Sequence, residues 1–237
     1  MFRALSSRAE RLLVADERCL IALYENVVPN PQALFETVRA SAVWSREVDD
    51  FGEQDRETCY VGDEGCTFAF VGLTLRPRPW TPAVRALRRE LEGLLAPRVG
   101  ALIGGSAAPL QLSGCLMNRY DANAGFIPWH SDEVRAHGPS RVVCAVSLGG
   151  PRRFLVRAKP AATGGDPDPP VLHDVALPSG SALLMAGDAQ ARYEHALPLD
   201  VGAAPARISL TYRSIVPGFE EERAHTQAPS PAARSGE

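Results

Sequence analysis

A change of hydrophobic period near residue 105 constrains the fold of this chain more than any other feature. After Gly104 and Gly105, apolar residues alternate with polar ones at a period of two, the spacing of a half-buried β-strand. Clusters of Gly, Pro and Asp separate the runs, as turns separate strands. The six runs cover residues 111–120, 126–132, 141–148, 152–158, 181–187 and 206–216. So many short strands predict a jelly roll or sandwich, mostly β with flanking helices (α+β).

Two helices are expected before these strands. One begins at Pro31 and continues through Ala40. The second has Thr81 as its N-cap and Pro82 at its first position, and it continues to Pro97. Its apolar residues recur at helical spacing, at Val84, Leu87, Leu91 and Leu94.

These elements divide the chain into four parts. We expect an N-terminal helical segment (1–45), a region that includes the second helix (46–105), a strand-rich core (106–217) and a tail (218–237). The tail is rich in Ala, Pro, Ser and charged residues, a composition that predicts disorder. The Pro- and Gly-rich segment 160–170 is expected to be a surface loop.

Composition limits the compartment and the partners. The chain has 237 residues, of which 45% are apolar, enough for a large core. Its net charge of -3 provides no broad basic field, so any contact with nucleic acid must be local. Five cysteines without a C-x-x-C pair indicate a reducing, intracellular compartment. No apolar run has the length of a membrane span, so no membrane contact is expected.

The opening segment MFRALSSRAERLL bears on localisation. It contains arginine and serine, as mitochondrial transit peptides do, but helix-forming surface residues are the favoured interpretation. We therefore expect the nucleus if the source is eukaryotic and the cytoplasm if it is bacterial.

A histidine and an aspartate two residues apart are the first candidate metal ligands. His130 and Asp132 lie in a strand-like run, so their side chains face the same way and both can reach one ion. His195, beside another apolar run, supplies a second imidazole. Two histidines and one carboxylate form the facial triad of non-haem iron(II) oxygenases, which leaves coordination positions open. The H-x-D pattern alone is weak evidence, because a surface His–Asp pair produces it too.

Polar residues on two other runs predict an anion site. In the last run, Arg207 and Arg213 share one face with hydroxyl side chains, while Ile208, Leu210 and Tyr212 face the other side. Burying an unpaired guanidinium is costly, so these arginines require an anion. A dicarboxylic co-substrate such as 2-oxoglutarate would satisfy them. Asn118 and Tyr120, again two residues apart, add an amide and a phenol.

Five motifs together resemble, in order and spacing, the AlkB family of Fe(II)/2-oxoglutarate-dependent dioxygenases. They are NRY (118–120), WHSDE (129–133), SLGGPRRFLVR (147–157), HALP (195–198) and RISLTYR (207–213). Segment 60–80 and the capped helix after it are similar to the nucleotide-recognition region of AlkB homologues that repair alkylated duplex DNA in animals. The similar segments span 50–217. The resemblance implies a double-stranded β-helix core (106–217) preceded by a nucleotide-recognition extension (46–105).

The resemblance also implies a reaction. Fe(II), 2-oxoglutarate and O2 would be required, and the substrate would be alkylated DNA with bases of the 1-methyladenine or 3-methylcytosine type. Hydroxylation of the N-methyl group would release formaldehyde, while 2-oxoglutarate and O2 yield succinate and CO2. No general base is needed, so none is assigned.

Seven positions match the metal and co-substrate residues of the family. His130, Asp132 and His195 match the iron ligands. Arg207 matches the arginine that pairs with the distal carboxylate of 2-oxoglutarate, and Arg213 a second arginine near its metal-binding end. Asn118 and Tyr120 match the residues that donate hydrogen bonds to the co-substrate.

Further positions match substrate contacts. Phe70 matches the aromatic residue that stacks on a flipped base opposite His130, and Phe68 stands where the relative has tyrosine, so it lacks the hydroxyl. Phe51 resembles the wedge that fills the gap left by the extruded base, and Arg56 an arginine of the DNA-contacting loop. The family often has an acidic base contact where this chain has Val134, and only the neighbouring Glu133 is acidic here.

The substrate and the partners have alternatives. Segment 47–55 is acidic where a phosphate-facing hairpin should be neutral or basic, and the part between Phe51 and Arg56 is shorter than in the duplex-repairing relative. The same chemistry on single-stranded DNA, RNA or a small alkylated molecule is therefore an alternative, and an iron-free jelly-roll binding module is a rival of another class. A basic stripe formed by Arg76, Arg78, Arg152 and Arg153 would favour nucleic acid. We expect a monomer.

Overall fold

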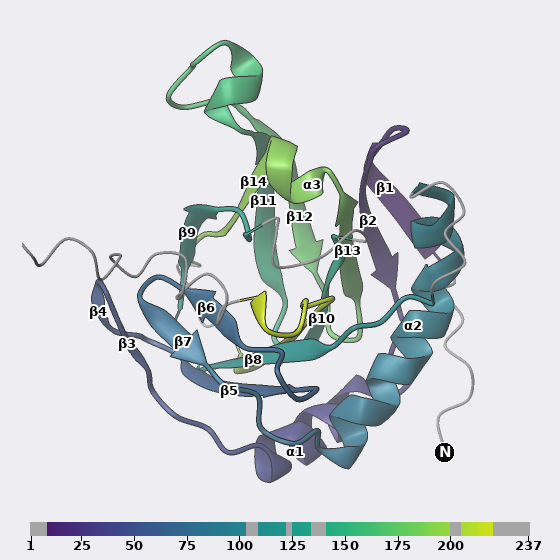
Figure 1. Ribbon diagram of the computed structural model, residues 1–237, viewed down its shortest axis with the longest axis vertical. Helices are drawn as coiled ribbons and strands as arrows, with labels where there is room; N and C mark the ends of the chain where they lie inside the picture. Colours follow the sequence, from purple (N-terminus) through teal and green to yellow (C-terminus); the bar gives the residue numbers. More distant parts are fainter. Residues whose placement is uncertain (1–8, 103–108, 122–124, 134–140, 200–204, 220–237) are drawn as a thin grey trace, which may run out of the picture.

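Two antiparallel β-sheets face each other in the computed structural model, which describes residues 9–102, 109–121, 125–133, 141–199 and 205–219 (Figure 1). The larger sheet has the order β1-β2-β13-β10-β15-β8-β5 and the smaller one β12-β11-β14-β9. The larger sheet comprises β1 (Ala9–Ala15), β2 (Cys19–Glu25), β5 (Glu57–Gly62), β8 (Gly114–Tyr120), β10 (Val143–Gly149), β13 (Ala182–Gly187) and β15 (Arg207–Arg213). The smaller sheet comprises β9 (Ile127–His130), β11 (Arg152–Ala158), β12 (Val171–Leu177) and β14 (Tyr193–Leu197). The predicted jelly-roll class is confirmed.

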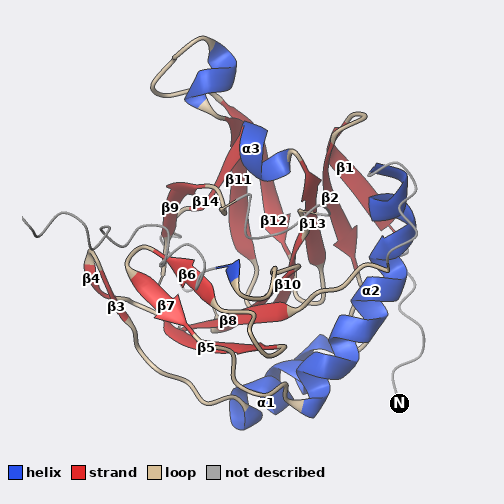
Figure 2. Cartoon of the chain, in the orientation of Figure 1, coloured by secondary structure: helices blue, strands red, loops and turns tan. Residues whose placement is uncertain are grey.

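Two helices, α1 (Pro31–Ser41) and α2 (Pro82–Leu102), cover the outer face of the larger sheet (Figure 2). Asn30 caps α1, since its side-chain oxygen accepts a hydrogen bond from the backbone N–H of Ala33 at 3.1 Å. The helix α2 passes through Pro97 and ends later than the sequence predicts. Leu95 before Pro97 and Val99 after it continue the buried stripe, so packing on the sheet outweighs the lost hydrogen bond.

Side chains alternate between the two faces of the larger sheet, so a strand such as β13 contributes to two apolar cores. On β13, Leu184 packs toward α1 and α2, while Leu183 and Met185 pack toward the smaller sheet. Phe154 and Val156 of β11 meet them from the opposite side. The molecule therefore has three layers, helices, larger sheet and smaller sheet, and the inner faces of the two sheets enclose the site described below.

Two short hairpins flank the open end of the sheets (Figure 1). They are β3 (Val48–Asp49) with β4 (Gly52–Glu53) and β6 (Phe68–Phe70) with β7 (Leu73–Leu75). The backbone N–H of Asp50 donates to the carbonyl of Val71 at 3.3 Å. At Gly72, φ is +76°, and a β-carbon there would lie 2.1 Å from a carboxylate oxygen of Asp50. Glycine is therefore required where the hairpins meet.

The expected N-terminal helical segment is wrong for residues 9–25. These residues form β1 and β2, which extend the larger sheet, and within the described residues 9–45 only α1 is helical. The 160–170 segment begins with a single 3₁₀ turn, η2 (Pro160–Thr163), and its described side chains are largely exposed, as a surface loop requires. One further short helix, α3 (Ala189–Arg192), joins β13 to β14. Residues 220–237 of the predicted tail lie outside the described residues. No helix in the described part of the chain has the length and hydropathy needed to cross a bilayer.

Candidate active site

A cavity of about 980 Å³ opens between the two sheets and the two hairpins. The larger sheet supplies polar residues from β8 and β15, the smaller sheet supplies imidazoles from β9 and β14, and the hairpins supply aromatic rings. The residues matched above to metal, co-substrate and substrate contacts line it: Phe51, Arg56, Phe68, Phe70, Asn118, Tyr120, His130, Asp132, Glu133, His195, Arg207 and Arg213. The fold thus brings these twelve residues, which are spread along the chain from 51 to 213, around one cavity. Their individual roles stay predictions.

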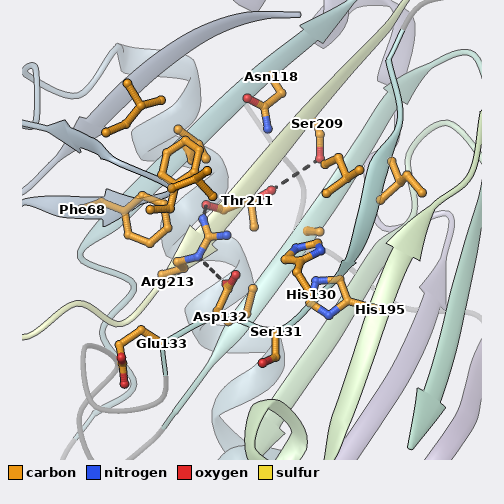
Figure 3. A pocket seen from close by; sticks show the side chains of 18 of the residues that line it. Phe68, Asn118, His130, Ser131, Asp132, Glu133, His195, Ser209, Thr211 and Arg213 are labelled. Carbon is orange, nitrogen blue, oxygen red and sulfur yellow. Dashed lines mark hydrogen bonds and ion pairs between the residues drawn. The ribbon is translucent and has the colours of Figure 1, made fainter. Parts of the chain in front are cut away.

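His130, Asp132 and His195 form one cluster, with a ligand atom of each within 4.8 Å of those of the other two (Figure 3). His130 and His195 are cross-strand partners on β9 and β14, and their ring centroids are 4.2 Å apart. Nδ1 of His130 lies 2.8 Å from the carbonyl of Pro128, so a proton on Nδ1 leaves Nε2 free for a metal. Burial, and then the neighbouring His130, lower the pKa of His195 to about 3, so this imidazole is neutral and available as a ligand.

Asp132 reaches the cluster from a loop, not from the strand as the spacing predicted, because β9 ends at His130. Two contacts hold it there. Nε of Arg213 donates to a carboxylate oxygen of Asp132 at 2.7 Å, and the buried Gln190 of α3 accepts a hydrogen bond from the Asp132 backbone N–H at 2.9 Å. Sequence reasoning missed Gln190, since a single glutamine in a short helix carries no periodic signal.

Arg207 is a buried cation with unused hydrogen-bonding capacity. Its side chain is 1% exposed, and Nη2 donates to the Ser147 hydroxyl at 3.0 Å. Within the described residues, its Nε and Nη1 and the Tyr120 hydroxyl are buried without a hydrogen-bond partner. Burial lowers the pKa of Arg207, because desolvation disfavours the charged guanidinium. An anion bound in the cavity would offset that cost. Asn118, 6% exposed on β8, is the cross-strand partner of Ser209 on β15 and lines the same cavity (Figure 3). This donor set fits the distal carboxylate of 2-oxoglutarate.

Aromatic residues form the wall near the hairpins. The rings of Phe68 and Phe70 are 5.4 Å apart, and the guanidinium of Arg213 lies 4.4 Å from the Phe68 centroid. Phe51, at the tip between β3 and β4, is 91% exposed, so it does not pack the hairpin against the domain. Arg56 is half-buried and Glu133 is exposed at the same cavity.

Other expectations near the site have mixed outcomes. Val134 lies outside the described residues. Arg76 and Arg78 are exposed, and Arg76 lines the cavity. The proposed basic stripe is nevertheless not formed by all four residues, because Arg152 is buried and Arg153 is paired with Asp174 at 2.6 Å.

Comparisons with known proteins relate the chain to a family of oxygenases. Residues 50–213 match the family model described as the 2OG-Fe(II) oxygenase superfamily. The chain is 31% identical over 163 residues to mouse DNA oxidative demethylase ALKBH2, covering 68% of this chain and 62% of the relative. It is 27% identical over 167 residues to human alpha-ketoglutarate-dependent dioxygenase alkB homolog 3, covering 70% and 53%. The chain thus spans between half and two thirds of these relatives' length.

A solved structure, that of OsALKBH1, has a similar fold. It aligns over 81% of this chain and 97% of its own with a TM-score of 0.58 and 18% identity. The cofactors of the matched superfamily are Fe(II), 2-oxoglutarate and O2, as the sequence predicted, and the His-Asp-His cluster and Arg207 suit the first two. The chain therefore belongs to the 2OG-Fe(II) oxygenase superfamily and, by its similarity to ALKBH2 and alkB homolog 3, to the AlkB family within it.

Proposed function

We propose that this protein is an oxidative demethylase that removes N-methyl groups from damaged bases in DNA. The observation that carries the proposal is the single cavity that holds the His-Asp-His cluster, the unpaired guanidinium of Arg207 and the Phe68–Phe70 pair. The names of the relatives, DNA oxidative demethylase and alkB homolog, support the same substrate class. Bases of the 1-methyladenine or 3-methylcytosine type are the expected lesions.

The residues divide into a metal end and a co-substrate end. His130, Asp132 and His195 would hold Fe(II), and Arg207 with Tyr120 would hold the far carboxylate of 2-oxoglutarate. When bound, Fe(II) with 2-oxoglutarate and O2 supplies the oxidation of N–CH3 to N–CH2OH, and the co-substrate leaves as succinate and CO2. The N–CH2OH group then loses formaldehyde as its C–N bond breaks and its hydroxyl proton passes to the base nitrogen. That last step requires no side chain as a base.

The aromatic wall would recognise the base. Phe68 and Phe70 present apolar faces beside the metal cluster, where a flipped base can stack. Phe51 projects from its hairpin with nothing covering it among the described residues, which suits a wedge that enters a duplex after a base leaves. We therefore assign Phe51, Arg56, Phe68, Phe70 and Glu133 to substrate contact.

One observation favours a second candidate, the same reaction on a single strand. The hairpin that carries Phe51 also carries Asp49, Asp50 and Glu53. Carboxylates close to a phosphate backbone repel it and weaken the binding of nucleic acid. A duplex carries two phosphate backbones and a single strand carries one, so the repulsion is greater for the duplex.

Demethylation of a matched set of substrates tests the proposal. One 3-methylcytosine is placed in duplex DNA, in single-stranded DNA, in RNA and in the free nucleoside, and methyl loss is followed by mass spectrometry with Fe(II) and 2-oxoglutarate. We expect DNA to lose its methyl group and the nucleoside to react far more slowly. Asp132→Ala is the blank. Equal rates on nucleoside and DNA would overturn the assignment of a nucleic-acid substrate.

A further inference from the structure

The outer face of the smaller sheet carries a cluster directly behind the metal ligands. Val156, His195 and His130 occupy neighbouring positions across β11, β14 and β9 and point into the cavity or core. The residues beside them in the chain therefore point outward. They are Arg157, Glu194 and Trp129, one from each of the three strands.

Arg157 contacts both of the other strands. Its Nε donates to a carboxylate oxygen of Glu194 at 3.0 Å, and its guanidinium carbon lies 4.3 Å from the Trp129 ring centroid. Nη1 donates to Asp168 at 2.7 Å, in the loop that projects beyond β11 (Figure 1). The side chain is only 8% exposed although it lies on the outer face. A guanidinium so enclosed has a fixed position, because three partners surround its planar fork.

The strand that carries His130 needs such support. β9 has four residues and lies at the edge of the smaller sheet. It pairs with β14 at two positions only, His195 with His130 and Leu197 with Ile127, and the register shifts between them. So short and irregular a ladder fixes an edge strand weakly. Side-chain contacts must therefore set the distance between His130 and His195.

Arg157 contacts the residues that immediately precede the two histidine ligands. Glu194 immediately precedes His195, and Trp129 immediately precedes His130. From β11, Arg157 reaches over β14 and stacks on β9, so one side chain holds both ligand strands. We propose that Arg157 is a positioning residue of the metal centre, which sets the spacing of His130 and His195 from the far side of the sheet through Glu194 and Trp129.

The chain contains a matched control on the same strand. Arg153 also points outward from β11, four residues earlier, and pairs with Asp174 of β12. It therefore carries the same charge and an ion pair on the same sheet, but its partner strand holds no ligand. Arg157→Leu and Arg153→Leu differ in whether the lost contact reaches β9 and β14.

Binding of Co(II) to the whole chain tests the proposal without relying on turnover. The visible spectrum of bound Co(II) reports ligand geometry, and titration reports affinity. Outer contacts of metal ligands typically change affinity about 10- to 100-fold, so we expect a loss of that size and an altered spectrum for Arg157→Leu. Arg153→Leu should keep both. Arg157→Lys keeps the charge but not the planar fork, so it should fall between wild type and Arg157→Leu.

A second variant covers the case in which Arg157→Leu does not fold. Trp129→Leu removes the other half of the stacking contact and should alter the Co(II) spectrum in the same direction. If Arg157→Leu or Trp129→Leu lowers the Tm but binds Co(II) with the affinity and spectrum of the wild type, the contact is only structural and the proposal is wrong. The inference rests on the proposed metal centre, and a wild-type chain that binds no Co(II) would contradict that centre itself.

Discussion

Arg207 is among the largest side chains that the protein buries completely, and most of its hydrogen-bonding capacity is unused. If 2-oxoglutarate supplies the missing anion, removing the guanidinium should weaken co-substrate binding sharply. Truncating one partner of a buried charge pair costs about 2–5 kcal/mol, so Arg207→Ala should raise the half-saturating 2-oxoglutarate concentration at least ~30-fold.

Succinate release at varied 2-oxoglutarate measures this effect. Ser147→Ala is the matched comparison, since it removes only the neutral hydroxyl to which Arg207 donates and should shift the titration much less. An unchanged titration for Arg207→Ala would remove this residue from the co-substrate site.

The three candidate ligands should be needed for chemistry but not for the fold. They lie at the cavity, outside the two large apolar clusters that hold the sheets and helices together. His130→Ala, Asp132→Ala and His195→Ala should each abolish Fe(II)-dependent succinate release and leave the thermal unfolding transition cooperative. Near-normal activity in any one of them would show that the ligand assignment is wrong.

The five cysteines are predicted to be unreactive in the native protein. All are buried and unpaired by disulfides. Burial raises the pKa of Cys19 to about 11 and that of Cys144 to about 12, so almost no thiolate, the reactive form, is present at neutral pH. Mass spectrometry after iodoacetamide treatment should find little labelling of folded protein and five labels in denaturant. Rapid labelling of one native cysteine would contradict the described packing.

At the scale of elements, the β3–β4 hairpin separates duplex repair from single-strand repair. If Phe51 fills a vacated base stack, Phe51→Ala should penalise only the substrate from which a paired base must be extruded. We expect activity on methylated duplex to fall at least about tenfold more than activity on the single strand, a difference of roughly 1.4 kcal/mol.

The same hairpin provides the control. Val48 is also apolar and 66% exposed, but it lies in β3 rather than at the tip. Val48→Ala should leave the ratio of duplex to single-strand activity unchanged when both substrates are assayed at one ionic strength. Equal losses on both substrates for Phe51→Ala would favour the single-stranded substrate.

The helix α2 is held to Asp63, the residue that follows β5, by an ion-pair cluster whose strength should depend on pH. Arg88 donates to Asp63 at 2.8 Å and to Glu92 at 2.9 Å, and the Trp80 indole donates to Asp63 at 2.7 Å. Burial raises the pKa of Asp63, but the hydrogen bonds from Arg88 and Trp80 outweigh it and lower the pKa below the ordinary value of 3.8. The stabilisation is therefore present at neutral pH and is lost as the pH falls below about 4.

Arg88→Leu should accordingly lower the Tm at pH 7 by roughly 2–4 °C, the equivalent of about 1 kcal/mol for a partly buried ion-pair cluster. The deficit should shrink as the pH is lowered through the pKa of Asp63, because Asp63 then loses its charge in the wild type too. Arg89→Leu, on the exposed side of the same helix, is the control. A deficit that does not change with pH would mean that Arg88 acts by packing alone.

Elements differ in how well their sequence predicts them. The cap and apolar spacing of α2 are local signals, so its start is predictable, but Pro97 does not end it because Leu95 and Val99 pack on the sheet. Strand β2 is buried along nearly its whole length, so its sequence lacks the alternation that reveals a half-buried strand. Beyond residue 105, the six predicted runs correspond to β8, β9, β10, β11, β13 and β15, but β12 and β14 are not among them.

For the whole molecule, the residues of the candidate site are easier to predict from the sequence than the contacts that hold those residues in position. Residue types and spacing make His130, His195 and Arg207 candidates, because metal and carboxylate chemistry restricts the choice of side chain, and the family resemblance adds their roles. The outer contacts are invisible in the sequence, since Gln190 and Arg157 act through partners that lie far from them in the chain or on other strands. Long-range contacts of this kind follow from the assembled sheets.

The ratio of formaldehyde to succinate tests the central claim most directly. The protein is incubated with Fe(II), O2, 2-oxoglutarate and single- or double-stranded DNA that carries 3-methylcytosine, and both products are counted. The account predicts one formaldehyde for each succinate, dependence on Fe(II), and little of either product when the base is unmethylated or Asp132 is replaced by alanine. Succinate release that is unaffected by the methylated base, with no formaldehyde from any DNA, would contradict it.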